Sequence, residues 1–144
     1  TSLKALLGGY VLSDCEGTPD VILIGTGSEI ELCMGAKELL SAKGKKVRVV
    51  SMPCMEEFEK QTAEYKESVL PRSVKARVCV EAASHFAWYK YCGDCGEVIA
   101  MHTFGVSAPA KQVVEYFGVT KENVAEKAEL SMRKAEAERQ EQSK

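Results

Sequence analysis

Short apolar runs along the chain predict the strands of a sheet. Four of these runs are rich in β-branched residues and are continuous rather than alternating, which is typical of strands covered on both faces. They are Val21 to Ile24, Val47 to Ser51, Val78 to Val80 and Val98 to Met101. The segment GGYVLSD, residues 8–14, can add a short strand at an edge. The pattern predicts a mostly parallel, mixed sheet of about five strands.

Helical patterns separate the apolar runs. After Ser28, apolar residues recur at three- and four-residue spacing up to Leu40, and Gly44 stands where a helix end favours a left-handed residue. Further helices are predicted from Thr62 to Leu70, from Pro109 to about Gly118, and from Thr120 onward. Strands that alternate with helices indicate a single three-layer α/β domain.

The last helical run ends in RKAEAERQEQ, which carries charge on all sides. We therefore divide the chain into an α/β domain over residues 1–130 and a charged helical or frayed tail over residues 131–144. The final Ser143 and Lys144 fall one residue short of a Ser-Lys-Leu peroxisomal signal. A cytoplasmic location is expected, and a peroxisome-type organelle is the alternative if one more residue completes that signal.

Composition narrows the functional classes. With 144 residues, 45% hydrophobic and 28% charged, the chain has the balance of a soluble globular domain. Its net charge of −2 gives no electrostatic reason to expect a nucleic acid or an anionic membrane as partner. No apolar run approaches the roughly 18 residues that span a bilayer. The N-terminus lacks the pattern of a signal peptide and begins without Met, so we expect a piece of a longer protein.

The six cysteines are expected to be reduced thiols. Cys33 and Cys79 fall in helical and strand patterns, where cysteine is usually a small buried apolar residue. Cys92 and Cys95 form a Cys-X-X-Cys motif, but the motif precedes a strand instead of following one, at the unfavourable end of a helix dipole. No second pair of cysteines or closely spaced histidines completes a zinc site. A redox pair is the weaker interpretation, and no metal ligands are assigned.

The turn in DVILIGTGSEIEL is the first candidate binding site. Gly25, Thr26, Gly27 and Ser28 place backbone amides at a helix start, where anions bind. Ser28 and Glu31 also match a capping box that satisfies those amides internally. A dinucleotide fingerprint would need a small residue at position 30 and an acid after the next strand, and the sequence has neither. A plain chain reversal is favoured, with a weak anion site as the alternative.

A second candidate surface lies beyond the later strands. Glu81, His85 and His102 follow strand ends and are expected at one rim of the sheet, but their spacing shows no nucleophile with a partnered base. The same segment supplies large apolar area in a short span, which favours contact with a partner. The predicted domain or subunit interface comprises Glu81, His85, Phe86, Trp88, Tyr89 and Tyr91.

Five stretches, in order, resemble one known family. They are GGYVL with DVILIGTGSEIEL, then KVRVVSMP, then ESVLPRSVKARVCVEA, then WYKYCG, and TFGVSAPA with EYFG. Together they closely resemble the C-terminal domain of transketolase from about Gly8 to Ala128, a Rossmann-like α/β unit. No single motif is diagnostic, but the order and spacing of all five are specific.

The resemblance implies a parent enzyme with chemistry outside this chain. Transketolases are homodimers that use thiamine diphosphate and a divalent cation, Mg or Ca, to move a two-carbon ketol unit between sugar phosphates in the pentose phosphate pathway. The first and middle domains hold the cofactor, while the C-terminal domain packs on the middle domain and supports the dimer. The nearest string to the family's Gly-Asp-Gly motif, Gly93-Asp94-Cys95, ends in cysteine.

This chain is therefore expected to hold no catalytic residue, no cofactor and no metal, and to be inactive alone. Its expected partners are the other domains of transketolase and a second subunit. Two rivals remain: a stand-alone regulatory module that binds an anion or nucleotide at Gly25 to Ser28, and a thiol oxidoreductase that uses Cys92 and Cys95.

Overall fold

The sheet has five strands in the order β1-β3-β2-β4-β5. In this computed structural model, which describes residues 6–27, 29–81, 87–100 and 120–142, β3, β2, β4 and β5 run parallel, and β1 joins β3 antiparallel. The strands are β1 (Tyr10–Ser13), β2 (Val21–Gly25), β3 (Val47–Ser51), β4 (Arg77–Glu81) and β5 (Glu97–Ala100). The predicted α/β fold, with a mostly parallel, mixed sheet and a short edge strand near the N-terminus, is confirmed.

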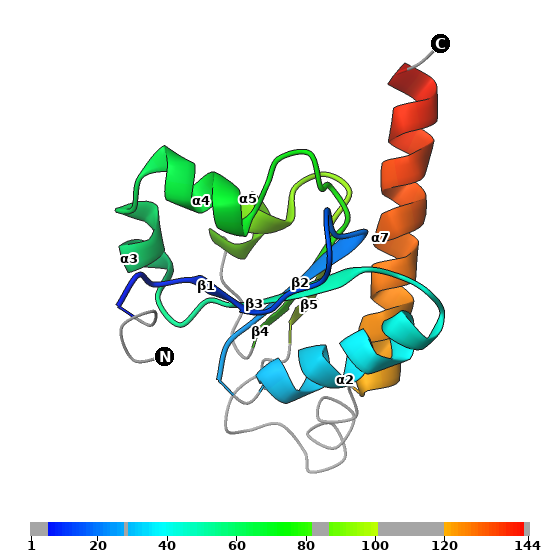
Figure 1. The fold of residues 1–144 in the computed structure, drawn as a ribbon, viewed down its shortest axis with the longest axis horizontal. Coiled ribbons are helices and arrows are strands. Elements are labelled where there is room, and N and C mark those ends of the chain that lie inside the picture. The colour runs from blue at the N-terminus through cyan, green and yellow to red at the C-terminus, as the bar shows by residue number, and fades with distance from the viewer. Residues whose placement is uncertain (1–5, 28, 82–86, 101–119, 143–144) are drawn as a thin grey trace, which may run out of the picture.

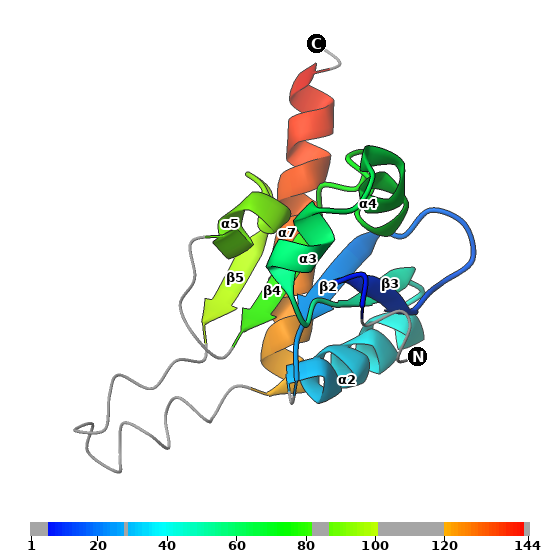
Figure 2. The ribbon, with the colours of Figure 1, turned by 90° about the vertical axis from the view of Figure 1, so that its left-hand side faces the viewer.

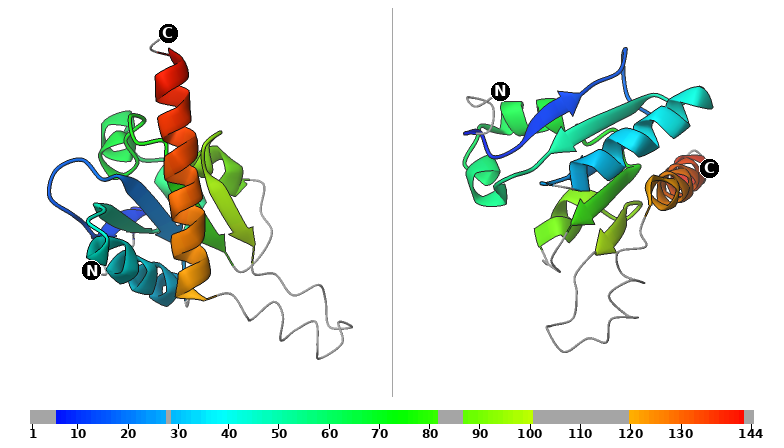
Figure 3. Two further views of the ribbon diagram at one scale, coloured as in Figure 1. Left: turned by 90° about the vertical axis from the view of Figure 1, so that its right-hand side faces the viewer. Right: turned by 90° about the horizontal axis from the view of Figure 1, so that it is seen from below.

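Helices cover both faces of the sheet, which makes three layers (Figure 1). On one face lie α2 (Glu29–Ala42) and α7 (Lys121–Gln142), and on the other lie α3 (Met55–Glu59), α4 (Ala63–Val69) and α5 (Ala87–Cys92). Figure 2 shows α3, α4 and α5 beside one another, and the left view of Figure 3 shows α7 in front of the sheet, with β5 beside it. The helix predicted from Pro109 to Gly118 lies outside the described residues.

The core explains why the strands are apolar without alternation. Along β2, Val21 and Leu23 pack with α2 and α7, while Ile22 and Ile24 pack with the helices of the other face. All four side chains have no exposed surface. A strand buried on both faces has no polar side, so its sequence reads as a continuous hydrophobic run.

The predicted ends of α2 and α4 are confirmed, and each is explained by a residue at the helix end. Gly44 follows α2 with φ of +83°, the left-handed conformation that favours glycine after a helix. Thr62 caps α4, since its side chain accepts a hydrogen bond from the Tyr65 amide at 3.1 Å. α4 ends before Pro71. The short helix α3 was not predicted, because five residues are too few to show a period.

The long helix α7 runs without a break across residue 130. Residues at positions 124, 128, 131, 135, 138 and 142 recur at alternating spacings of four and three, and therefore follow one stripe of the helix. Val124, Ala128 and Ser131 are fully buried, and Ala135 is half-buried. The stripe contains the polar residues Ser131 and Glu138, and the end of α7 extends past the body of the domain (Figure 1). The division into residues 1–130 and 131–144 stays a prediction.

All six cysteines are free thiols, and Cys33 and Cys79 are fully buried as predicted. Among the described residues, no helix is both long enough and apolar enough to cross a membrane.

Candidate functional site

The carboxyl ends of the four parallel strands form one edge of the sheet. β2 and β4 are paired up to Gly25 and Val80, and β4 and β5 are paired up to Glu81 and Ala100. The glycine turn and the backbone of Glu81 therefore share this edge, as the sequence predicts. His85 and His102 lie outside the described residues, so their predicted proximity to Glu81 stays a prediction.

The glycine turn is tightly packed against α2. A Cβ on Gly25 would lie 3.0 Å from the Cys33 sulfur, and Gly27 has φ of +57°. The amides of Glu29 and Ile30 donate to the carbonyls of Thr26 and Gly27 at 3.1 and 3.3 Å. These contacts direct two of the first helical amides into the turn itself. Ser28 lies outside the described residues, so the predicted capping box is untested.

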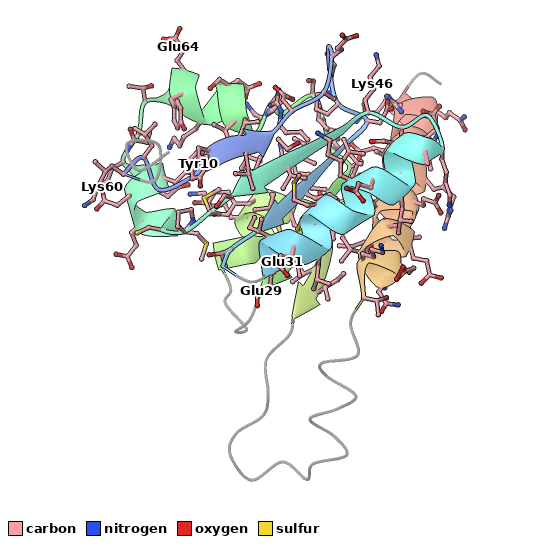
Figure 4. The ribbon with its side chains drawn as sticks, turned by 60° about the horizontal axis from the view of Figure 1, so that its bottom comes forward. Tyr10, Glu29, Glu31, Lys46, Lys60 and Glu64 are labelled. Carbon is pink, nitrogen blue, oxygen red and sulfur yellow. The ribbon has the colours of Figure 1, made fainter. Side chains whose placement is uncertain are left out.

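The charge beside the turn is negative. Glu29 is only 7% exposed, and its carboxylate oxygen lies 3.6 Å from the position of a Cβ on Gly27. Figure 4 shows Glu29 and Glu31 at the start of α2, at the opposite edge of the sheet from Lys46. Burial and the neighbouring Glu29 raise the pKa of Cys33 to about 12. An incoming anion would meet this buried carboxylate, which favours a chain reversal over an anion site.

Tyr91 of the predicted interface packs inside this chain. It is 5% exposed, its ring meets Phe58 edge-on at 5.8 Å, and its hydroxyl donates to Glu59 at 2.6 Å. Burial, followed by the hydrogen bond to Glu59, raises the pKa of Tyr91. Little of Tyr91 is left for a partner.

The remaining members of the predicted interface are less fully defined. The backbones of Trp88 and Tyr89 lie in α5 and that of Glu81 ends β4, but their side chains lie outside the description. His85 and Phe86 lie outside the described residues altogether. The interface as a set stays a prediction.

Arg77 is the side chain that sequence reasoning missed. Its guanidinium donates to four carbonyls, those of Leu70, Pro71, Val74 and Tyr91, at 2.6–3.3 Å. Because Leu70 is the C-cap of α4 and Tyr91 lies in the last turn of α5, one cation serves the negative ends of two helices. Burial lowers the pKa of Arg77 from its ordinary value, without removing its charge near neutral pH. Arg77 thereby fixes the helix that carries Trp88 and Tyr89.

The Cys-X-X-Cys motif lies between α5 and β5, the helix-to-strand order that the sequence predicts. Cys92 and Cys95 are 2% and 5% exposed, and their sulfurs donate to the Glu97 carbonyl at 3.2 Å and to the Glu138 carboxylate at 2.9 Å. Burial first, and Glu138 second, raise the pKa of Cys95. A redox pair needs a stabilised, accessible thiolate, and this environment opposes one.

Comparison with known proteins decides the family. The model of the transketolase-like TK C-terminal domain matches residues 8–120. The chain belongs to this transketolase family. Transketolase 2 of Vibrio parahaemolyticus is 57% identical over 121 residues, which cover 84% of this chain and 18% of that protein. The chain thus spans less than a fifth of the length of this curated relative.

Solved transketolases share the fold. The structure of transketolase from Leishmania mexicana has a TM-score of 0.76 and 37% identity, over 91% of this chain and 19% of that one. Transketolase from Pichia stipitis in complex with sedoheptulose-7-phosphate has the same TM-score and coverage at 38% identity. The predicted resemblance to transketolase is confirmed, and a stand-alone regulatory module is not favoured.

The transketolase family match ends at the start of α7. Ser131 of α7 is nevertheless fully buried, donates to the Cys95 carbonyl at 2.5 Å and accepts from the Arg77 amide at 2.9 Å. The helix is therefore part of the transketolase-type core in this chain, although the match does not include most of it.

Proposed function

We propose that this chain is the C-terminal domain of an enzyme that transfers a two-carbon ketol unit from a ketose phosphate to an aldose phosphate, in the pentose phosphate pathway. The observation that carries the proposal is the 57% identity to a transketolase over 84% of the chain, together with the family match. The relative crystallised with sedoheptulose-7-phosphate supports a sugar phosphate as the substrate of the whole enzyme.

Thiamine diphosphate and a divalent cation, Mg or Ca, would be held by the other domains of that enzyme. The described residues do not fit this cofactor: among them no group of three or more His, Cys, Asp or Glu side chains could hold a metal ion. The glycine turn between β2 and α2 faces the buried Glu29. No catalytic step is therefore assigned to this chain, and we expect it to be inactive alone.

The role proposed for the chain is support of its neighbours in a homodimer. Arg77 and Glu59 hold α5 against the body, since Glu59 binds both Lys90 and Tyr91 at 2.6 Å. The rigid attachment of α5 would present Trp88 and Tyr89 to a neighbouring domain or to the second subunit.

The interface is tested by Trp88→Ala in the full-length enzyme. We expect weaker dimerisation in analytical ultracentrifugation, with unchanged turnover per dimer at saturating protein. Leu12→Ala is the matched control, because Leu12 is an apolar side chain that is 40% exposed on β1. An unchanged dimer with lower turnover would contradict the assignment.

The family role is tested by a chimera. Residues 8–120 replace the corresponding segment of Vibrio parahaemolyticus transketolase 2, and ketol transfer is measured with thiamine diphosphate and Mg²⁺. We expect kcat within about tenfold of the parent, because the reacting groups lie in the unchanged domains. The same enzyme without this segment should lose assembly. A folded, dimeric but inactive chimera would contradict the proposal.

A cytoplasmic location is proposed for the whole enzyme, and the reading frame after Lys144 tests it. A leucine as the next and last residue would complete a peroxisomal signal and favour that organelle instead.

A further inference from the structure

A groove of about 870 Å³ separates the second half of α7 from the loops that enter β2 and β4. Residues 18–20 and 73–76 and the Lys45 side chain before β3 form one side, and residues of α7 from Glu129 to Gln142 form the other. The groove lies at the edge of the sheet where β2 and β4 begin, and Figure 1 shows α7 extending past this edge. The glycine turn follows the end of β2 and lies at the opposite edge. The volume of the groove falls within the roughly 300–1,000 Å³ of small-molecule sites.

The floor of this amino-edge groove is apolar. Pro19, Val74 and Ala76 are buried, and Met132 and Ala135 are half-buried on the facing side of α7. Apolar surface of this kind suits a compact hydrophobic group, which would bury it further.

Two cations on its walls have side chains that form no ion pair or hydrogen bond within the described part of the chain. They are the exposed side chains of Lys45 and Arg133, which act on Glu129 by charge at longer range. Other arginines differ: Arg48 binds Asp14 and the Ser68 and Val69 carbonyls. The guanidinium of Arg133 keeps its full set of donors for a ligand.

The two cations converge on one carboxylate that is already paired. Lys43 binds Glu129 at 2.8 Å, and this hydrogen bond is the main protein contact that lowers the pKa of Glu129. Arg133 and Lys45 lower it further by their charge. Lys43 is paired with this carboxylate, and two further cations act on it by charge, which leaves positive charge in excess at this end of the groove.

The other acidic groups of the groove are engaged. Glu136 pairs with Arg139, and the Asp20 carboxylate accepts the amide of Lys46 at 2.8 Å. Glu138, which faces the domain from the same stretch of α7, pairs with Lys75. Asp20 keeps its negative charge, because a backbone amide does not neutralise it. Lys45 and Arg133 still outnumber this one carboxylate without an ion pair, so the charge among these residues stays positive.

We propose that the amino-edge groove binds a small organic anion, a phosphate ester or carboxylate on a compact apolar body. Lys45 and Arg133 bind the anionic group, and Val74, Met132 and Ala135 contact the body. An ammonium and a guanidinium from separate elements suit an anion with several acceptor oxygens. This site is independent of ketol transfer and lies at the opposite edge of the sheet from the glycine turn.

The test is titration of the isotope-labelled 144-residue chain, followed by amide chemical shifts. The probes are phenyl phosphate, benzoate, inorganic phosphate and benzyl alcohol. We expect saturable shifts at Lys45, Val74 and Arg133 with phenyl phosphate or benzoate, and the better of the two identifies the anionic group. Inorganic phosphate and benzyl alcohol, each lacking one half of the ligand, should bind at least about tenfold more weakly.

Variants then separate specific binding from general attraction. The double variant Lys45→Gln/Arg133→Gln should weaken binding about tenfold, the summed effect of two partly exposed charge pairs. The matched control, Lys60→Gln/Arg72→Gln, removes the same charge from residues paired elsewhere with Glu57 and Glu67, and should leave binding unchanged.

Three results would overturn the proposal. One is the absence of saturation with either aromatic anion. The second is equal weakening in both double variants, which would show non-specific attraction. The third is a set of shifts confined to Thr26 to Ile30, which would move the site to the glycine turn.

Discussion

Two arginines near the amino ends of the strands have opposite surroundings. Arg77 opens β4, is partly buried, and donates to four carbonyls under α4 and α5. Arg133 stands on α7 at the wall of a groove, is exposed, and its side chain forms no ion pair or hydrogen bond among the described residues. The hydrogen-bond donors of Arg77 are used within the fold, whereas those of Arg133 are available to a ligand.

The difference shows how to separate structural from spare charge. A buried guanidinium whose donors are occupied is part of the scaffold, since removing it leaves several acceptors without partners. An exposed guanidinium beside an apolar floor contributes little to folding and can bind a ligand. Substitutions in the two neighbourhoods should therefore differ in their effect on stability.

The largest expected effect is that of Arg77→Met. Its free energy of unfolding should fall by about 3 kcal/mol, because four carbonyls lose their donor. Urea denaturation of the chain measures this change. Arg77→Lys should be intermediate, since an ammonium cannot reach as many acceptors as the guanidinium fork. A stable Arg77→Met variant would remove the distinction between the two arginines.

Ser131→Ala should have the next largest effect. Ser131 links α7, which carries Arg133, to the start of β4, because its hydroxyl accepts from the Arg77 amide and donates to the Cys95 carbonyl. Losing both contacts in a fully buried site should cost about 2 kcal/mol in the same denaturation measurement. Ser41→Ala, at an exposed position of α2, is the control and should be nearly neutral. Equal effects of the two variants would show that α7 is not held through Ser131.

Glu59→Gln should have a smaller effect on stability, and that effect should depend on pH. Hydrogen bonds from Lys90 and then Tyr91 lower the pKa of Glu59 in the folded chain. The stability that this carboxylate adds is present above its unfolded pKa of about 4.3, and is lost as the pH falls through the lower folded value. The wild-type advantage, within about 1 kcal/mol for a partly exposed group, should therefore be present at pH 7 and vanish in acid.

Denaturation at several pH values measures the Glu59→Gln difference. Glu56→Gln is the matched control, because Glu56 is exposed on the same helix and has no ion pair among the described residues. An advantage of wild-type Glu59 that grew as the pH fell would contradict the assigned contacts.

The smallest expected effect is that of Arg133→Met. Its stability should stay within about 0.5 kcal/mol of wild type, as is usual for an exposed side chain away from specific contacts. A loss as large as that of Arg77→Met would mean that Arg133 is structural, and the groove would lose its spare cation.

Much of the fold could be predicted because it is encoded locally. The runs at β2, β3 and β4 are continuous, and Gly44 marks the end of α2 by its own backbone preference. The short helix α3 was not predicted, because it has no repeating apolar pattern and is stabilised by the packing of Phe58 in the core.

The site was less predictable because its contacts are distant in sequence. Arg77 binds the Tyr91 carbonyl 14 residues away, and Ser131 binds the Cys95 carbonyl 36 residues away. The charged residues at the end of α7 led to its interpretation as a tail. The side of α7 that faces the domain was not recognised, because Ser131 and Glu138 on that side are polar. The sequence did contain one signal for this contact. Ser131 falls on the same helical stripe as Val124 and Ala128, and a polar residue at such a position indicates a buried hydrogen bond.

The most direct test of the central claim is ketol transfer by the 144-residue chain alone, with thiamine diphosphate, Mg²⁺ and both sugar phosphates present. The account predicts no turnover above the rate without protein, because the role proposed for the chain is to support an active site that other domains supply. Turnover by the purified chain, proportional to its concentration, would contradict it.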